Sequence, residues 1–165
     1  MIIKIISGGQ YGADIGGLAA ARDNLIPTGG YAPLGYKTIY GPNPKLKMLG
    51  LIELGTANYR SRTFKNVKHS DGTIRFAYDF NTPGEICTIK ALTFFKKPHF
   101  DISLDNLPEI DKVIEWIKAF DIKILNVAGN TGKNRKESNK IFCIVRKYLG
   151  QVLSELKKES TCTLK

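Results

Sequence analysis

The sequence predicts an α/β protein with three layers, α/β/α, and a mainly parallel sheet. Two observations support this fold class. Short apolar segments alternate with longer amphipathic segments along the chain, which is typical of parallel strands joined by helices. The first apolar segment, residues 2–6, runs into a glycine-rich turn and then into a stretch of small residues, 17–22, that is compatible with a helix. This arrangement is the Rossmann-like form of the α/β class.

The predicted strands are short and apolar, and they cover residues 2–6, 29–32, 73–78, 99–102 and 122–127. The helices that follow the first one are predicted at residues 57–68, 84–96, 108–120 and 136–156. In the segment 108–120, apolar residues recur every three or four positions and form one stripe: Ile110, Val113, Ile114 and Ile117. We expect this stripe to face the core, with Trp116 at its edge.

One long segment, residues 33–55, lacks a clear helix or strand pattern and is rich in Gly, Pro and Lys. Loops of this length within a domain usually serve a function, so it is predicted to be a flap, a binding loop or an oligomer contact. No repeat or linker divides the chain. We therefore expect residues 1–165 to form a single domain, with a flexible tail from about residue 157 to 165.

Composition limits the functional classes. With 42% hydrophobic and 24% charged residues, the 165-residue chain resembles an ordinary soluble protein. It has no apolar run of the roughly 20 residues that cross a membrane and no signal-peptide pattern at residues 1–4, so we expect a cytoplasmic protein without membrane contact. The net charge of +10 is spread along the chain without a zinc-finger spacing or an RNA-binding aromatic motif, so nucleic acid is not an expected partner. The three cysteines match no disulfide or zinc pattern, and no metal site is predicted.

The glycine turn, Ser7-Gly8-Gly9-Gln10-Tyr11-Gly12, is the strongest local signal. Backbone N–H groups of such a turn converge at the positive end of the following helix, where they can bind phosphate. The glycine spacing differs from the dinucleotide-binding pattern, and residues 129–134 do not form a Walker A loop, so neither standard nucleotide site is predicted. A tight turn without a ligand is the alternative interpretation.

Further loops follow the other strands, at residues 31–37, 79–88 and 126–135. Thr82, Gly84 and Thr88 could form a second anion site at a helix start, although Glu85 could occupy that position instead. Lys37 and Arg62 are candidate cations, and only the arginine can hold a phosphate with two hydrogen bonds. Helix capping and surface exposure are the alternative roles of these residues.

Five motifs occur in order along the chain: Ser7-Gly8-Gly9-Gln10-x-Gly12-x-Asp14, Gly29-Gly30-Tyr31-x-Pro33-x-Gly35, Tyr59-x-x-Arg62-Thr63-x-x-Asn66-Val67-x-x-Ser70-Asp71-Gly72-Thr73, Lys97-Pro98, and Leu125-Asn126-Val127-Ala128-Gly129. Together they resemble the molybdenum cofactor carrier family, and the match extends from Ile5 to about Ile141. That family is similar to the lysine-decarboxylase-like, or cytokinin-activating, Rossmann-type proteins and to nucleotide-sensing domains.

The resemblance implies a homo-oligomer, a dimer or a tetramer, that binds molybdenum cofactor or a nucleotide-like ligand in a crevice at the strand ends. It implies these binding residues: Gly8, Gly9, Gln10, Gly12, Arg62, Thr63, Asn66, Ser70, Asp71, Thr88, Asn126 and Gly129. Tyr11, Lys37, Thr82 and Gly84 complete the candidate site.

Several positions depart from the family pattern. Tyr11 replaces a Thr, Ile15 replaces an Arg, and Glu85 stands where a Thr is expected. In the hydrolase branch of the superfamily a Glu lies beside the glycosidic bond, and Lys90 occupies that position here, which disfavours the hydrolase mechanism. We therefore expect binding without catalysis. The alternatives are a nucleotide-processing hydrolase that uses Asp14, Asp71 or Glu85, and a degenerate member that acts through protein contacts.

Overall fold

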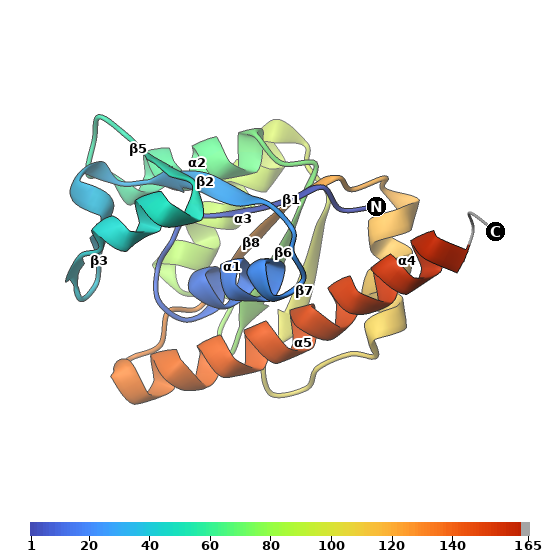
Figure 1. Cartoon of the computed structure of the whole chain (residues 1–165). Helices are drawn as coiled ribbons and strands as arrows, with labels where there is room; N and C mark the ends of the chain where they lie inside the picture. Colours follow the sequence, from blue (N-terminus) through green and yellow to red (C-terminus); the bar gives the residue numbers. More distant parts are fainter. Residues whose placement is uncertain (163–165) are drawn as a thin grey trace.

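The computed structural model describes residues 1–162, and a six-stranded parallel sheet forms its centre (Figure 1). The strands lie in the order β5-β2-β1-β8-β6-β7. Their bounds are β1 (Lys4–Ser7), β2 (Thr28–Ala32), β5 (Leu51–Glu53), β6 (Gly72–Ala77), β7 (His99–Ser103) and β8 (Ile124–Gly129). The predicted α/β fold class with a parallel sheet is confirmed.

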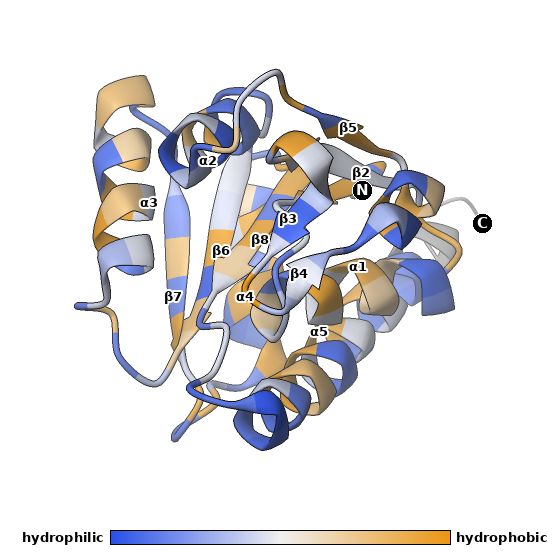
Figure 2. Ribbon diagram, turned by 90° about the vertical axis from the view of Figure 1, so that its left-hand side faces the viewer, coloured by the Kyte–Doolittle hydropathy of each residue, from blue (hydrophilic) through white to orange (hydrophobic). Residues whose placement is uncertain are grey.

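Helices cover both faces of this sheet, and their bounds are α1 (Ala13–Asp23), α2 (Tyr59–Lys68), α3 (Pro83–Phe95), α4 (Ile110–Ala119) and α5 (Arg135–Cys162). Figure 2 shows α2 and α3 together on one face and α1 with α5 on the other. No helix within residues 1–162 combines the length and the apolar character that spanning a membrane requires.

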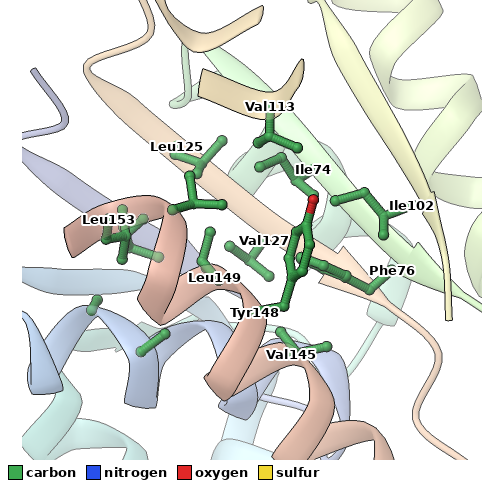
Figure 3. Close-up of a cluster of buried hydrophobic side chains, with 14 of the residues drawn as sticks. Ile74, Phe76, Ile102, Val113, Leu125, Val127, Val145, Tyr148, Leu149 and Leu153 are labelled. Carbon is green, nitrogen blue, oxygen red and sulfur yellow. The ribbon is translucent and has the colours of Figure 1, made fainter. Parts of the chain in front are cut away.

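The main core lies between the sheet and α5 (Figure 3). Phe76 of β6 and Val127 of β8 pack with Leu149 of α5, and all three side chains are buried. The ring of Tyr148 stands edge-on to Phe76 at 6.0 Å between centroids. The apolar stripe predicted in α4 is confirmed, since Val113, Ile114 and Ile117 are buried and Ile110 packs against the same core.

The segment 33–55, called the flap below, is more regular than its sequence suggests. It holds two 3₁₀ turns (Leu34–Tyr36 and Pro44–Leu49), the hairpin of β3 (Lys37–Thr38) and β4 (Gly41–Pro42), and then β5. The prediction missed β5, a three-residue edge strand that pairs in parallel with β2.

The end of the chain lies partly outside the described residues. Helix α5 includes residues 157–162, whereas residues 163–165 of the predicted tail fall beyond them. The flexible tail therefore stays a prediction, and so does the single domain over residues 1–165.

The connections place the functional loops at one edge. Strands β1, β2 and β5 extend the sheet in one direction, and β6 and β7 extend it in the other, with β8 between β1 and β6. The order reverses beside β1 and β8, which is where ligands bind in open parallel sheets. The loops after β1, β6 and β8 all open onto this edge.

Candidate functional site

A cavity of about 410 Å³ lies at the carboxyl ends of β1 and β8, between the amino ends of α2 and α3. Its walls come from five parts of the chain: Gln10 of the glycine turn with Asp14 at the start of α1; Tyr59, Arg60, Arg62 and Thr63 of α2; Pro83, Gly84, Glu85, Cys87 and Thr88 of α3; Ala128 and Gly129 at the end of β8 with Thr131 after it; and Ile39 of the flap.

A second cavity of about 360 Å³ adjoins the first. The two share Gly84, Glu85, Gly129 and Thr131, and the second extends past Thr82 to Tyr78 and Lys133. We call the two cavities together the crevice. It unites the following residues from the candidate site: Gln10, Asp14, Arg62, Thr63, Thr82, Gly84, Glu85, Thr88 and Gly129.

The glycine turn holds a carboxylate of the protein itself. The N–H of Gln10 donates to Oδ2 of Asp14 at 3.1 Å, and Nη1 of Arg62 lies 3.2 Å from the same oxygen. The guanidinium of Arg62 covers Gly8 so closely that a Cβ added there would lie 1.7 Å from Nη1. Asp14 thus accepts a hydrogen bond from the turn at which the sequence predicts a ligand phosphate.

The glycines of this turn are needed for its shape. Gly9 and Gly12 have φ angles of +74° and +79°, which L side chains rarely adopt. A Cβ at Gly12 would also approach the carbonyl oxygen of Asn130 to 2.5 Å. Gly8, Gly9 and Gly12 therefore form the turn and admit Asp14 and Arg62, rather than lining the crevice with their own atoms.

Burial controls the electrostatics of Asp14. Desolvation raises the pKa of this carboxyl above its usual value, while Arg62 and the Gln10 N–H act in the opposite direction. The desolvation effect is the largest of these, so the pKa of Asp14 in the cavity wall is raised overall.

A second carboxyl, Glu85, lies in the first turn of α3 and is buried. Nη1 of Arg75 approaches its Oε2 at 3.4 Å, but the guanidinium makes its strong contacts with Asp101, with Nε donating to Oδ1 at 2.7 Å and Nη2 donating to Oδ2. Desolvation, opposed by Arg75 and reinforced by the charges of Asp14 and Asp101, raises the pKa of Glu85 to about 7.

Arg75 is not among the residues predicted from the sequence. Its side chain is 4% exposed in the middle of β6, between the buried residues Ile74 and Phe76. A charged residue inside an apolar strand is the signal that could have revealed it, because a buried arginine requires acidic partners.

Gln10 and Tyr11 hold the flap over the turn. The side-chain amide of Gln10 donates from Nε2 to the Lys37 carbonyl at 3.0 Å and accepts the Ile39 N–H at 3.3 Å. The ring of Tyr11 lies 4.8 Å from that of Tyr40, whose hydroxyl is 3.1 Å from Oγ of Ser138. The departure at Tyr11 thus has a structural explanation, since the ring packs on the flap. Lys37 contributes its backbone carbonyl to this contact, and it does not line the crevice.

Four predicted site residues lie elsewhere and bond to the protein. Asn66 Nδ2 donates to the Tyr31 carbonyl at 3.0 Å, and Asn126 Nδ2 donates to Thr73 Oγ1 at 3.1 Å. Ser70 Oγ donates to the Val67 carbonyl. Asp71 accepts the backbone N–H groups of Lys123 and Ile124, so it lies at the amino end of β8, opposite the crevice.

None of these four residues lines either cavity, and the polar groups named here bond to the protein itself. Their assignment to a ligand site stays a prediction. Among residues 1–162 there is also no group of three or more His, Cys, Asp or Glu that could hold a metal.

Comparison with known proteins places this geometry in a family context. The model of the circularly permutated YpsA SLOG family matches residues 5–153. The chain is also similar to the crystal structure of a "putative molybdenum carrier protein" from Syntrophus aciditrophicus SB, with 33% identity and a TM-score of 0.79. That match covers 92% of this chain and 94% of the other. The search of curated proteins found no match.

Proposed function

The chain belongs to the circularly permutated YpsA family of the SLOG superfamily, and from this premise we propose that it binds an anionic, phosphate-bearing small molecule in the crevice. Molybdenum cofactor and nucleotides are the two ligand classes that fit the proposal. The similar protein from Syntrophus aciditrophicus is named a molybdenum carrier, which supports the first class. A cavity of about 410 Å³ is within the usual range for small-molecule sites.

The observation that carries the proposal is the unpaired arginine on the α2 wall. Arg60 is exposed at the cavity and makes no ion pair among the described residues, while Arg62 beside it is largely buried and pairs with Asp14. An arginine in a cavity wall without an acidic partner favours an anionic ligand.

The remaining walls suit the organic part of such a ligand. Ile39, Pro83 and Ala128 provide apolar contacts, and Thr63 provides a hydroxyl beside the arginines. In this proposal the phosphate contacts Arg60 and Thr63, the organic part lies between the flap and α3, and no bond of the ligand is broken. The cytoplasmic location and the dimeric or tetrameric assembly expected from the sequence complete the proposal.

The test is a binding measurement on the purified chain at low salt. Native mass spectrometry with nucleotides and pterin phosphates identifies a bound class, and calorimetry then gives its Kd. We expect Arg60→Ala to weaken binding roughly ten-fold, because one charge-assisted contact is lost. Arg22→Ala is the matched control, an exposed arginine in the last turn of α1, and it should leave Kd unchanged. Absence of binding by every phosphate compound at low salt would contradict the proposal.

A second candidate is a hydrolase that acts on the same ligands. Two carboxyls with raised pKa values, Asp14 and Glu85, line the cavity, and Glu85, with a pKa of about 7, can act as an acid near neutral pH. Native mass spectrometry over time separates the two functions. A product mass that forms with the wild-type protein and does not form with Glu85→Gln would support catalysis. Action through protein contacts alone stays a prediction, and it would gain support if neither binding nor turnover were detected.

A further inference from the structure

The inference below rests on the proposed function and concerns the organic part of the ligand. Two ion-paired arginines and three carboxylates lie in or beside the wall of the first cavity, and of these Arg62, Asp14 and Glu85 line it. Arg62 pairs with Asp14, and Arg75 pairs through two nitrogens with Asp101. Glu85 is the third carboxylate and receives only the 3.4 Å contact with Arg75 from an arginine. The side chain of Glu85 is 3% exposed, and of the three carboxylates it has the longest arginine contact.

A buried carboxylate with one long ion-pair contact is stabilised by a ligand that brings hydrogen-bond donors to it. The 3.4 Å contact with Arg75 leaves further acceptor capacity on Glu85, because an ionised carboxylate has about four lone-pair sites. Since Glu85 lines both cavities, a ligand in the crevice can reach it. The complementary group is a pair of adjacent N–H donors, which matches the two oxygens of a carboxylate.

The wall beside Glu85 is open at Gly84. A Cβ added at Gly84 would meet no heavy atom within 4 Å, and the φ angle of this residue is not positive. Neither packing nor backbone strain therefore accounts for this glycine, although glycine weakens a helix relative to alanine. The open backbone of Gly84, with Ile39 and Ala128 on the other walls, leaves room for a planar ring against the start of α3.

We propose that the crevice selects a planar heterocycle of the 2-amino-4-oxo type, as in guanine and pterins, whose ring N–H and amino group donate to the Glu85 carboxylate. The phosphate of the same molecule then contacts the arginine wall of α2. Adenine presents a ring acceptor beside its amino group, and hypoxanthine lacks the amino group, so each offers Glu85 a poorer match.

The test compares three nucleotides that share a ribose 5′-phosphate: GMP, IMP and AMP. Calorimetry at pH 8 on the full chain should give a Kd for GMP at least ten-fold below those for IMP and AMP. In Glu85→Gln the amide presents only one acceptor oxygen, so this preference should fall to less than three-fold. Glu115→Gln, an exposed glutamate on α4, is the control and should keep the full preference.

A second variant tests the ring position independently. Gly84→Ala adds a methyl group to the proposed ring surface and should weaken GMP binding at least ten-fold without lowering the melting temperature. Equal affinities for the three nucleotides in the wild-type protein, or a preference that survives in Glu85→Gln, would overturn the inference while leaving the proposed function intact. If none of the three binds and other phosphate compounds do, only the inference fails. If no phosphate compound binds at all, the proposed function fails as well.

Discussion

Nη1 of Arg62 lies 3.2 Å from Oδ2 of Asp14, and the guanidinium covers Gly8. The arginine from α2 is therefore connected to the glycine turn after β1 through a carboxylate that is itself buried. Because the turn's Gln10 N–H donates to the same oxygen, Asp14 satisfies both the turn and the arginine. The Asp14–Arg62 pair therefore joins the glycine turn to α2 on the other side of the crevice.

Replacing Arg62 with Met should destabilise the protein, because it leaves the Asp14 carboxylate buried without its counter-ion. We expect a loss of about 3 kcal/mol in the free energy of unfolding at pH 8. The loss should be smaller at pH 5, since burial already raises the pKa of Asp14 and a neutral carboxyl needs no counter-ion. Urea denaturation at both pH values measures this difference. An equal loss at pH 5 and pH 8, or no loss at all, would show that Asp14 does not depend on Arg62.

Glu85 makes stability depend on pH in the window from about 4.5, its ordinary value, to about 7, its value in the folded protein. The folded state binds the proton more tightly than the unfolded chain, so stability is full below the window and declines as pH rises through it. We expect a decline of roughly 2–3 kcal/mol, measured by urea denaturation between pH 4.5 and 8. The charged groups facing Glu85 are Arg75, Asp101 and Asp14, and all three remain in the variant described next.

Glu85→Gln should remove most of this pH dependence and make the protein more stable than the wild type at pH 8. A residual slope of the same sign should persist, because Asp14 also has a raised pKa. Glu115→Gln, which is exposed on α4, should retain the wild-type slope. A wild-type stability that rises from pH 5 to pH 7 would refute the assignment of a raised pKa to Glu85.

Gln10 should control the flap. Its amide accepts the Ile39 N–H and donates to the Lys37 carbonyl, so Gln10→Ala removes both of these bonds between the glycine turn and the β3–β4 hairpin. We expect the Ile39 amide to exchange with solvent at least ten-fold faster, with a small change in melting temperature. Hydrogen exchange measured by NMR tests this expectation. Gln151→Ala, an exposed glutamine on α5, is the matched control, and an unchanged Ile39 rate in Gln10→Ala would mean that other contacts hold the flap.

Much of the fold follows from local patterns. The stripe of Val113, Ile114 and Ile117 predicts α4 because a helix must place residues three and four apart on one face. Strand β5 could not be predicted in this way. Of its three residues only Leu51 is buried, and its strand geometry comes from pairing with β2, a contact that the local sequence does not encode.

The position of the candidate site in the fold could be predicted from the sequence. Its individual residues were harder to predict. Parallel strands bring their carboxyl ends to one edge, so the convergence of the glycine turn with Thr63, Thr88 and Gly129 follows from the alternation of elements. Asp71 and Asn126 show the limit. The same polar side chains can bind a ligand or can bond to a neighbouring strand. Only the tertiary structure distinguishes these two roles.

Gly129 provides the sharpest stability test of the crevice floor. Its φ angle is +151°, and a Cβ would lie 2.0 Å from the Phe76 carbonyl oxygen on the adjacent strand, so Gly129→Ala must move β8 or β6. We expect a loss of at least about 3 kcal/mol, which for a chain of this size lowers the melting temperature by roughly 10 °C. Gly55→Ala is the control, because a Cβ there meets no atom within 4 Å and the φ angle is not positive. Thermal unfolding followed by circular dichroism gives both values. Similar melting temperatures for the two variants would mean that the end of β8 can shift away from Phe76 at little cost, and the floor of the crevice would then be a movable element.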